Sequence, residues 1–418
     1  MSDGAPARGS RIAAPEGATH ERGADGSSPP ETDPTETDPT EAKPTEAKPT
    51  EAHAEEMPRV VLTRRRAISF AIFVLSAIAF LYYGLPKVTG LGTTIHRIQR
   101  GDPWWIALGV VFELLSFAGY VAVFRAVFAR GSARIGLRES YLITLAGVLA
   151  TRLFAAAGAG GIAITAWALR RSGMEARVVA TRMVAFLVLL YSVYAGSLVL
   201  NGVGLGVGLF PGGGSFAITI VPAIIGAFLI GVAVVAAMLP ADIEPRLAGS
   251  SSGRGRPRPW QRAVARLGTV PAMARSGTRQ AIEIVRTRDP ALLGAVAWWG
   301  FDMGVLWACF HAFGVAPPFT VIWMAYFVGM FGNLLPLPGG LGGVEGGMIG
   351  ALAAFGVDIN LAVLAVLSYR AISFWLPTIP GAIAYLQLRR TVSHWRAEDL
   401  GVAGPARGAR VGVDAVRA

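Results

Sequence analysis

The sequence predicts an all-α membrane protein, a polytopic helix bundle with about six full spans and two shorter hairpins broken by glycine. Of its 418 residues, 53% are hydrophobic and only 16% are charged, and the mean hydropathy is +0.50. The apolar residues form long blocks close to the ~20 residues that cross a hydrocarbon core of ~30 Å. A soluble chain of this length needs more charge on its surface, so the composition indicates a protein solvated by lipid.

The N-terminal segment is predicted to be a disordered, acidic cytoplasmic tail over residues 1–62. Residues 31–50 form a pentapeptide repeat with a proline at every fifth position, which blocks a helix and offers nothing apolar to bury. Residues 1–58 hold 13 acidic and 5 basic side chains, so this segment carries −8 and the remainder +19 of the total +11. A transmembrane domain over 63–390 and a second disordered cytoplasmic tail over 391–418 follow.

Six apolar blocks are long enough to be full spans. They are Ala67–Pro86, Trp104–Phe128, Met183–Gly202, Phe216–Leu239, Ala291–Phe313 and Leu361–Leu388. Proline interrupts helical hydrogen bonding, so we expect the last block to kink at Pro377 and Pro380. Two further apolar regions, about Ser140–Leu169 and Thr320–Phe355, are interrupted by glycine.

Arginine placement predicts the topology. Arg64, Arg65 and Arg66 precede the first block, and the long loop 240–290 has ten arginines against four acids. Because cytoplasmic loops carry the excess of basic residues, this loop and both termini are predicted to be cytoplasmic. The first glycine-broken region must then enter and leave from the cytoplasm, and the second from the exterior. Such opposed re-entrant elements are typical of an inverted repeat, here about 67–202 and 216–388. Two ordinary short helix pairs are the alternative.

The stretch Asn333-Leu-Leu-Pro-Leu-Pro-Gly-Gly-Leu-Gly-Gly-Val-Glu-Gly-Gly347 is the strongest candidate for a site. Its prolines end one helix and its glycines permit a sharp turn before a second helix begins near Val344. The free N–H groups at the start of a half-helix suit an anionic group such as a lipid phosphate. The candidate binding residues here are Asn333, Gly340, Gly342, Gly343 and Glu345. The alternative is helix packing through GxxxG spacing, and Glu345 could instead meet a cation.

Four ionisable residues fall deep in apolar sequence and complete the candidate substrate-binding set: Glu113, Arg152, Asp302 and Arg370. A charge at the centre of the bilayer costs about 2.5–3.5 kcal/mol, so such a group is kept when it is paired or faces a polar cavity. Pairing of Asp302 with Arg370 is one arrangement that the composition permits. Both a structural ion pair between helices and a substrate path remain open at this stage.

Other chemistry finds little support in the sequence. Cys309 is the single cysteine, and the five histidines are scattered without the spacing of metal ligands. No nucleotide-binding or nucleophile motif is found, so we expect no catalytic residue, no metal and no cofactor, and a protein that is not an enzyme. The basic tract 253–262 favours anionic lipid headgroups over nucleic acid as its partner.

Three short motifs carry a family resemblance: Pro338-Gly-Gly-Leu-Gly-Gly-Val-Glu345, Tyr369-Arg370, and Gly160-Gly161 followed by Ala166-Trp-Ala-Leu-Arg-Arg-Ser-Gly-Met174. On these the chain resembles, over about 67–390, the transmembrane region of lysylphosphatidylglycerol synthases and their stand-alone relatives. In multidomain members this region is implicated in flipping aminoacylated phospholipid, while a separate cytosolic domain transfers the aminoacyl group from tRNA. Only 28 residues follow Arg390, so the resemblance does not imply transferase activity here.

The sequence therefore predicts a multi-pass protein of the bacterial inner membrane that flips or transports lipid through a cavity between the two broken hairpins. The expected partners are anionic or aminoacylated phospholipids or a polyprenyl-linked lipid. Two alternatives remain open. One is a membrane subunit of a lipid-linked glycosyl- or aminoacyl-transferase system, which needs a separate lipid-modifying enzyme, and the other is a scaffold that transports nothing.

Overall fold

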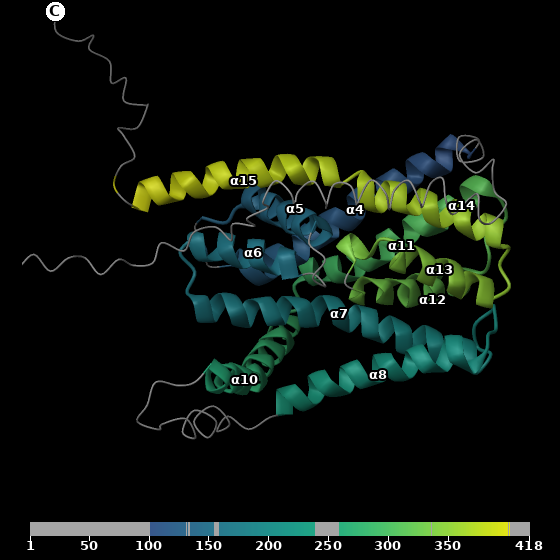
Figure 1. The fold of residues 1–418 in the computed structure, drawn as a ribbon, viewed down its shortest axis with the longest axis horizontal. Coiled ribbons are helices and arrows are strands. Elements are labelled where there is room, and N and C mark those ends of the chain that lie inside the picture. Colours follow the sequence, from purple (N-terminus) through teal and green to yellow (C-terminus); the bar gives the residue numbers. More distant parts are fainter. Residues whose placement is uncertain are drawn as a thin grey trace, which may run out of the picture. The chain divides into compact units, whose positions relative to one another are not determined.

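The computed structural model describes residues 101–130, 132, 134–153, 159–238, 259–335, 337–399 and 401. Over this part of the chain the regular structure is entirely helical, as Figure 1 shows, so the predicted all-α class is confirmed. The acidic tail, the predicted span Ala67–Pro86 and the first half of the basic loop lie outside the described residues. Five described helical segments are long and apolar enough to cross a membrane: Pro103–Phe128, Ala176–Gly206, Phe216–Met238, Pro290–Phe313 and Ile359–Asp399.

Helix α4 (Pro103–Phe128) and helix α11 (Leu293–Phe313) form the closest helix pair. Asp102 caps the start of helix α4, because its carboxylate accepts the N–H of Trp104 at 2.9 Å. Pro103 occupies the first helical position, where proline is favoured. Glycine lets the two backbones touch, because a Cβ on Gly119 would lie 2.8 Å from the carbonyl oxygen of Gly294. This crossing fixes the two helices that carry the buried acids Glu113 and Asp302.

Both glycine-broken regions fold as pairs of short helices. The first pair is α5 (Leu137–Leu153) and α6 (Ala159–Arg171). The second is α12 (Phe319–Met330) and α13 (Gly343–Ala354), joined through the 3-10 turns η3 (Phe331–Leu334) and η4 (Pro338–Gly340). The predicted pair of helices is therefore present in both places, and the break between them is seen in the second region, whereas residues 154–158 of the first lie outside the described part of the chain.

The two hairpins start from opposite ends of the bundle. At one end Arg134, just before α5, bonds Asp399 at 2.6 Å, and Arg182, near the start of α7 (Ala176–Gly206), reaches the carbonyl of Phe128. At the other end the hydroxyl of Thr320 donates to the carbonyl of Pro211. Figure 1 accordingly shows α5 and α6 in one half of the bundle and α12 and α13 in the other.

The inner ends of the two hairpins meet. A Cβ on Gly339, in η4 of the second hairpin, would lie 3.4 Å from the carbonyl oxygen of Arg152, at the end of α5 in the first. Each hairpin also packs into its own hydrophobic cluster. Buried residues of α5 and α6 belong to one, and those of α12 and α13 to the other. Gly339 and Gly340 of the second break are thus held against the first hairpin, whereas Asn333, Leu334 and Leu335 of the same break are exposed.

The last predicted span is interrupted where proline predicts it. It consists of α14 (Ile359–Arg370), the π-helical turn η5 (Ala371–Trp375) and α15 (Thr378–Asp399). The break falls at Pro377, whereas Pro380 lies in the first turn of α15, where helices tolerate proline. The predicted start of a disordered tail at 391 is wrong for residues up to Asp399, because Val392 and Trp395 are buried in a core cluster and keep the helix ordered.

The basic loop 240–290 is partly helical. Helix α10 (Pro259–Arg286) runs through its second half and packs against α7 and α8 (Phe216–Met238). Its buried face consists of small residues. Thr278 and Ala281 are 5% and 2% exposed, and Gly277 is buried as well. Where the burial of α10 is described, Arg279, Glu283 and Arg286 are exposed, so the arginine-rich sequence concealed a helix with a buried face of small residues and charges on its outer face.

Candidate functional site

A cavity of about 420 Å³ lies inside the bundle, where the inner ends of α5 and α6 face the break of the second hairpin. Its walls come from α4, α5, α6, α7 and α11, from the turns η3 and η4, and from the junction of α14 with η5. Six of the nine predicted site residues line it: Glu113, Arg152, Asp302, Asn333, Gly340 and Arg370. The structure therefore collects at one place residues that lie up to 257 positions apart in the sequence.

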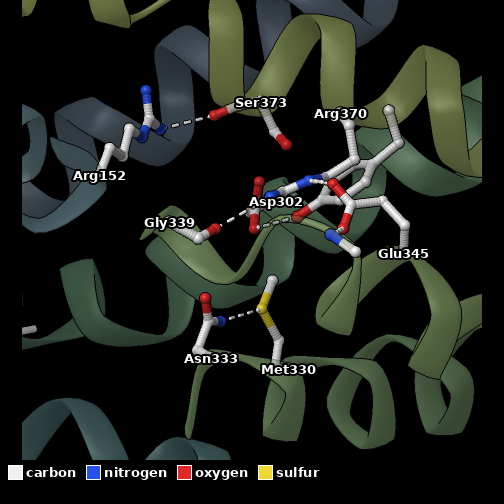
Figure 2. A network of polar contacts seen from close by, with 10 residues as sticks. Arg152, Asp302, Met330, Asn333, Gly339, Glu345, Arg370 and Ser373 are labelled. Carbon is white, nitrogen blue, oxygen red and sulfur yellow. Dashed lines mark hydrogen bonds and ion pairs between the residues drawn. The ribbon is translucent and has the colours of Figure 1, made fainter. Parts of the chain in front are cut away.

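Arg370 and Glu345 form a buried ion pair, drawn in Figure 2. The Arg370 Nε lies 2.6 Å from Glu345 Oε1, and the two side chains are 9% and 2% exposed. The Arg370 Nη2 also donates to the carbonyl of Gly339 at 3.0 Å. The pairing of Arg370 with Asp302 that the sequence allowed is thus wrong. The break before α13 places the carboxylate of Glu345, rather than that of Asp302, next to the guanidinium of Arg370. Arg370 clamps the turn η4 to helix α14.

The start of α13 is already capped. The second carboxylate oxygen of Glu345 accepts the N–H of Gly342 at 2.7 Å, the reciprocal contact that a glutamate three residues into a helix makes with its cap. Gly342 has a φ of 83°, a conformation that glycine adopts without strain. The N–H expected to await an anion is therefore engaged by Glu345. Gly342 and Gly343 do not belong to the cavity wall, whereas Gly339 and Gly340 do.

Arg152 holds the π-helical turn of the last span. Its Nη2 donates to the carbonyl of Ser373 at 2.7 Å and its Nη1 to the carbonyl of Phe374 at 2.6 Å, as Figure 2 shows for Ser373. Pro377 lacks the N–H that would bond Ser373 in a regular helix, which leaves that carbonyl free for another donor. A third contact, to Thr378 Oγ1, measures 3.3 Å. All three partners are neutral, so the charge of Arg152 is not cancelled by them.

One aromatic ring lies between the two arginines of the cavity. The Cζ atoms of Arg152 and Arg370 lie 5.0 Å and 4.5 Å from the ring centroid of Phe374. A guanidinium within about 6 Å of an aromatic face gains roughly 0.5–2 kcal/mol from the ring quadrupole. Phe374 thus allows two like charges, one from the first hairpin and one from the last span, to approach the same point of the cavity.

The acidic wall of the cavity comes from α4 and α11. The carboxylate oxygen Oδ2 of Asp302 accepts the hydroxyl of Tyr326 and, at 3.0 Å, that of Tyr369. Glu113 is 3% exposed, and its Oε2 has no hydrogen-bond partner among the described residues. The hydroxyl of Thr144, 2% exposed on α5, lacks a partner in the same way. Buried polar atoms rarely stay unpaired, so these two indicate a wall that meets water or a ligand.

The mouth of the cavity is apolar and reaches the outer surface of the bundle. Three residues of its wall are strongly exposed: Ile162 at 41%, Tyr191 at 53% and Leu334 at 71%. Asn333 stands beside them, exposed, with its amide 3.3 Å from the sulfur of Met330. A cavity with charged groups inside and apolar side chains at its opening suits a molecule that is polar at one end and apolar at the other.

Sequence reasoning missed several residues at this site. Tyr326 and Thr144 lie in apolar helices and carry no signal of their own. The role of Ser373 and Phe374 was within reach, because a predicted break at Pro377 leaves the carbonyl four residues earlier without its donor. What the sequence could not give was the donor, since Arg152 lies 221 positions away.

The fold and this cavity define an integral, multi-pass α-helical membrane protein with a buried charged site between two broken hairpins. The chain belongs to the family described as the lysylphosphatidylglycerol synthase TM region, whose model matches residues 66–381. It is also similar to two UPF0104 membrane proteins of Methanothermobacter thermautotrophicus. One is 37% identical over 91 residues, 22% of this chain and 26% of the relative. The other is 38% identical over 86 residues, 20% of this chain and 26% of the relative. The match thus spans about a quarter of the length of these relatives.

Proposed function

We propose that this protein moves a phospholipid or another lipid-linked anion between the leaflets of the membrane, with the headgroup passing through the cavity between the two hairpins. The observation that carries the proposal is the cavity itself. It places Arg152 and Arg370 on an inner wall and exposed apolar residues at its mouth. In this arrangement the headgroup enters the cavity while the acyl chains remain in the bilayer outside.

The charges inside the cavity support an anionic headgroup. Arg152 is bonded to neutral oxygens only, and guanidinium groups bind phosphate oxygens with strong, directional hydrogen bonds. Arg370 is held by Glu345 and by Gly339 at the turn η4, so a phosphate that draws Arg370 away would loosen the second hairpin. Binding at this point would therefore be coupled to the shape of the broken backbone.

Orientation and location follow in the same proposal. The end of the bundle that carries Arg130, Arg134 and Arg182 would face the cytoplasm of a bacterial cell, because basic residues are retained on that side. The chain would carry lipid rather than modify it, and any covalent change of the headgroup would be made by a separate enzyme.

Reconstituted vesicles test the proposal. The purified chain is placed in liposomes with tail-labelled phosphatidylglycerol, an aminoacylated phospholipid or a polyprenyl phosphate, and exchange between leaflets is followed by quenching of the label. We expect faster exchange of at least one of these lipids and a loss of that activity in Arg370→Ala and Arg152→Ala. The matched control is Arg279→Ala on the exposed face of α10, which should keep full activity. Exchange no faster than in empty vesicles for all three lipids would refute lipid movement.

A further inference from the structure

The carboxyl groups of Glu113 and Asp302 lie together deep in the bundle. They come from the tightly packed helices α4 and α11, are 3% and 9% exposed, and both line the cavity. The two side chains are within hydrogen-bonding reach of each other. Among the described ion pairs, none joins either carboxyl group to an arginine. Two adjacent buried carboxylates that form no ion pair with an arginine repel each other strongly, and such a pair favours sharing one proton.

The hydrogen bonds around the pair indicate which carboxyl group carries that proton. Tyr326 and Tyr369 both donate to the same oxygen of Asp302, and hydroxyl donors stabilise the ionised form of a carboxyl group. Asp302 is therefore placed to accept a third hydrogen bond rather than to donate one. Glu113 then has to supply the hydrogen between the two groups, and its other oxygen, Oε2, remains unpartnered in the buried wall.

The charged and titratable groups that face the pair come from four other elements. Arg152 approaches from α5 and acts electrostatically on both acids. Tyr326 approaches from α12, and Tyr369 and Arg370 from α14, while Tyr191 of α7 lines the same cavity. The nearest uncancelled cation is thus Arg152, which the proposed function assigns to the anionic headgroup. The unpartnered hydroxyl of Thr144 marks the same wall as one that meets water or a ligand.

We propose that Glu113 and Asp302 form a proton-binding pair, and that one proton enters the cavity together with each anionic headgroup. This inference rests on the proposed function for its second half. When no headgroup is present, the positive charge of Arg152 weakens the hold of Glu113 on the shared proton, so the proton leaves the cavity more readily. When a phosphate neutralises Arg152, the second negative charge loses that support and Glu113 holds its proton more firmly. By linkage, the proton and the headgroup each strengthen the binding of the other.

The coupling makes lipid movement depend on a proton gradient. One proton moved with one lipid of charge −1 carries no net charge, so the process responds to a pH difference and not to the membrane potential. For this stoichiometry a gradient of about one pH unit shifts the distribution of phosphatidylglycerol between leaflets by about tenfold. A protein that merely lets lipids exchange leaves both leaflets equal whatever the gradient.

The first experiment examines the proton without any need for transport. Infrared spectra of the purified full chain are recorded over a pH series with phosphatidylglycerol present, and the carbonyl stretch of a neutral carboxylic acid is followed. We expect this band near neutral pH in the wild-type protein and in Glu283→Gln, whose residue is exposed on α10. It should be absent in Glu113→Gln. A wild-type protein without the band overturns the proton-binding pair, whether or not lipid moves.

The second experiment examines coupling in vesicles with tail-labelled phosphatidylglycerol. With wild-type protein, an imposed pH gradient should enrich the label in one leaflet by about tenfold per unit, and a potassium diffusion potential should not. In Glu113→Gln, which keeps the shape and a hydrogen-bond donor, any remaining exchange should proceed without enrichment, whereas Glu283→Gln should keep both exchange and enrichment. Equal leaflets in wild-type vesicles that do exchange lipid overturn the coupling. No exchange at all refutes the proposed function instead, and the infrared band still decides the pair.

Discussion

Removal of the Glu345 carboxylate should destabilise the protein far more than removal of an ordinary helix cap. In Glu345→Ala the Arg370 guanidinium loses its countercharge while it remains 9% exposed. An uncompensated buried charge of this kind costs about 3–5 kcal/mol. The same change removes the acceptor of the Gly342 N–H, which adds about 1 kcal/mol, the usual contribution of a cap. We therefore expect a total of about 4–6 kcal/mol.

Thermal unfolding in detergent, followed by the loss of monodisperse protein, measures this effect. The matched control is Asp358→Ala, which removes a carboxylate that caps α14 through the N–H groups of Asn360 and Leu361. That loss involves no ion pair and should cost only about 1 kcal/mol. The double variant Glu345→Leu with Arg370→Met should recover most of the stability, since an apolar pair replaces a buried ion pair at little cost, yet it should move no lipid. Equal melting temperatures for Glu345→Ala and Asp358→Ala would refute the buried-pair reasoning.

Three further outcomes can be checked. Arg152→Lys should lose most lipid exchange, because an ammonium cannot reach both carbonyls that the guanidinium bonds, and vesicle assays beside wild type would show this; full activity would mean that only the charge matters. Gly294→Val should lower the melting temperature by several degrees, whereas Gly300→Val should not. A Cβ at position 294 would meet the backbone of α4, and a Cβ at position 300 would meet nothing within 4 Å. Equal melting temperatures would contradict the close crossing of α4 and α11. A water-soluble maleimide should leave the buried Cys309 unlabelled in folded protein, while Leu334→Cys at the cavity mouth should react, and an unreactive Leu334→Cys would place the mouth elsewhere.

The positions of the helices follow from the sequence because lipid imposes a length and a polarity on each span. The predicted start and end of α8 agree with the structure to within one residue. The prediction fails where tertiary packing extends a helix beyond its apolar core. Helix α7 starts at Ala176 rather than at Met183, and α15 continues to Asp399 because Trp395 is buried by neighbouring helices. No local pattern contains those contacts.

The sequence predicts which charged residues belong to the site, but not which of them interact with each other. A charge within an apolar block is costly, so Glu113, Asp302, Arg152 and Arg370 could be recognised singly. Their partners depend on which helices meet, and Arg370 pairs with Glu345 rather than with Asp302. The tyrosine hydroxyls on Asp302 were unpredictable for the same reason, because Tyr326 and Tyr369 face it from two other helices.

The bond between Arg152 and the π-helical turn has a mechanical consequence. The guanidinium ties the inner end of α5 to the π-helical turn that interrupts the last span, through hydrogen bonds to the carbonyls of Ser373 and Phe374. If one half of the bundle rotated against the other, these hydrogen bonds would lie near the axis of rotation. The middle of the bundle would then move little, and its two ends would open in turn. Such a motion would expose opposite ends of the cavity in turn, and its fixed point would be the arginine to which the proposed function assigns the headgroup.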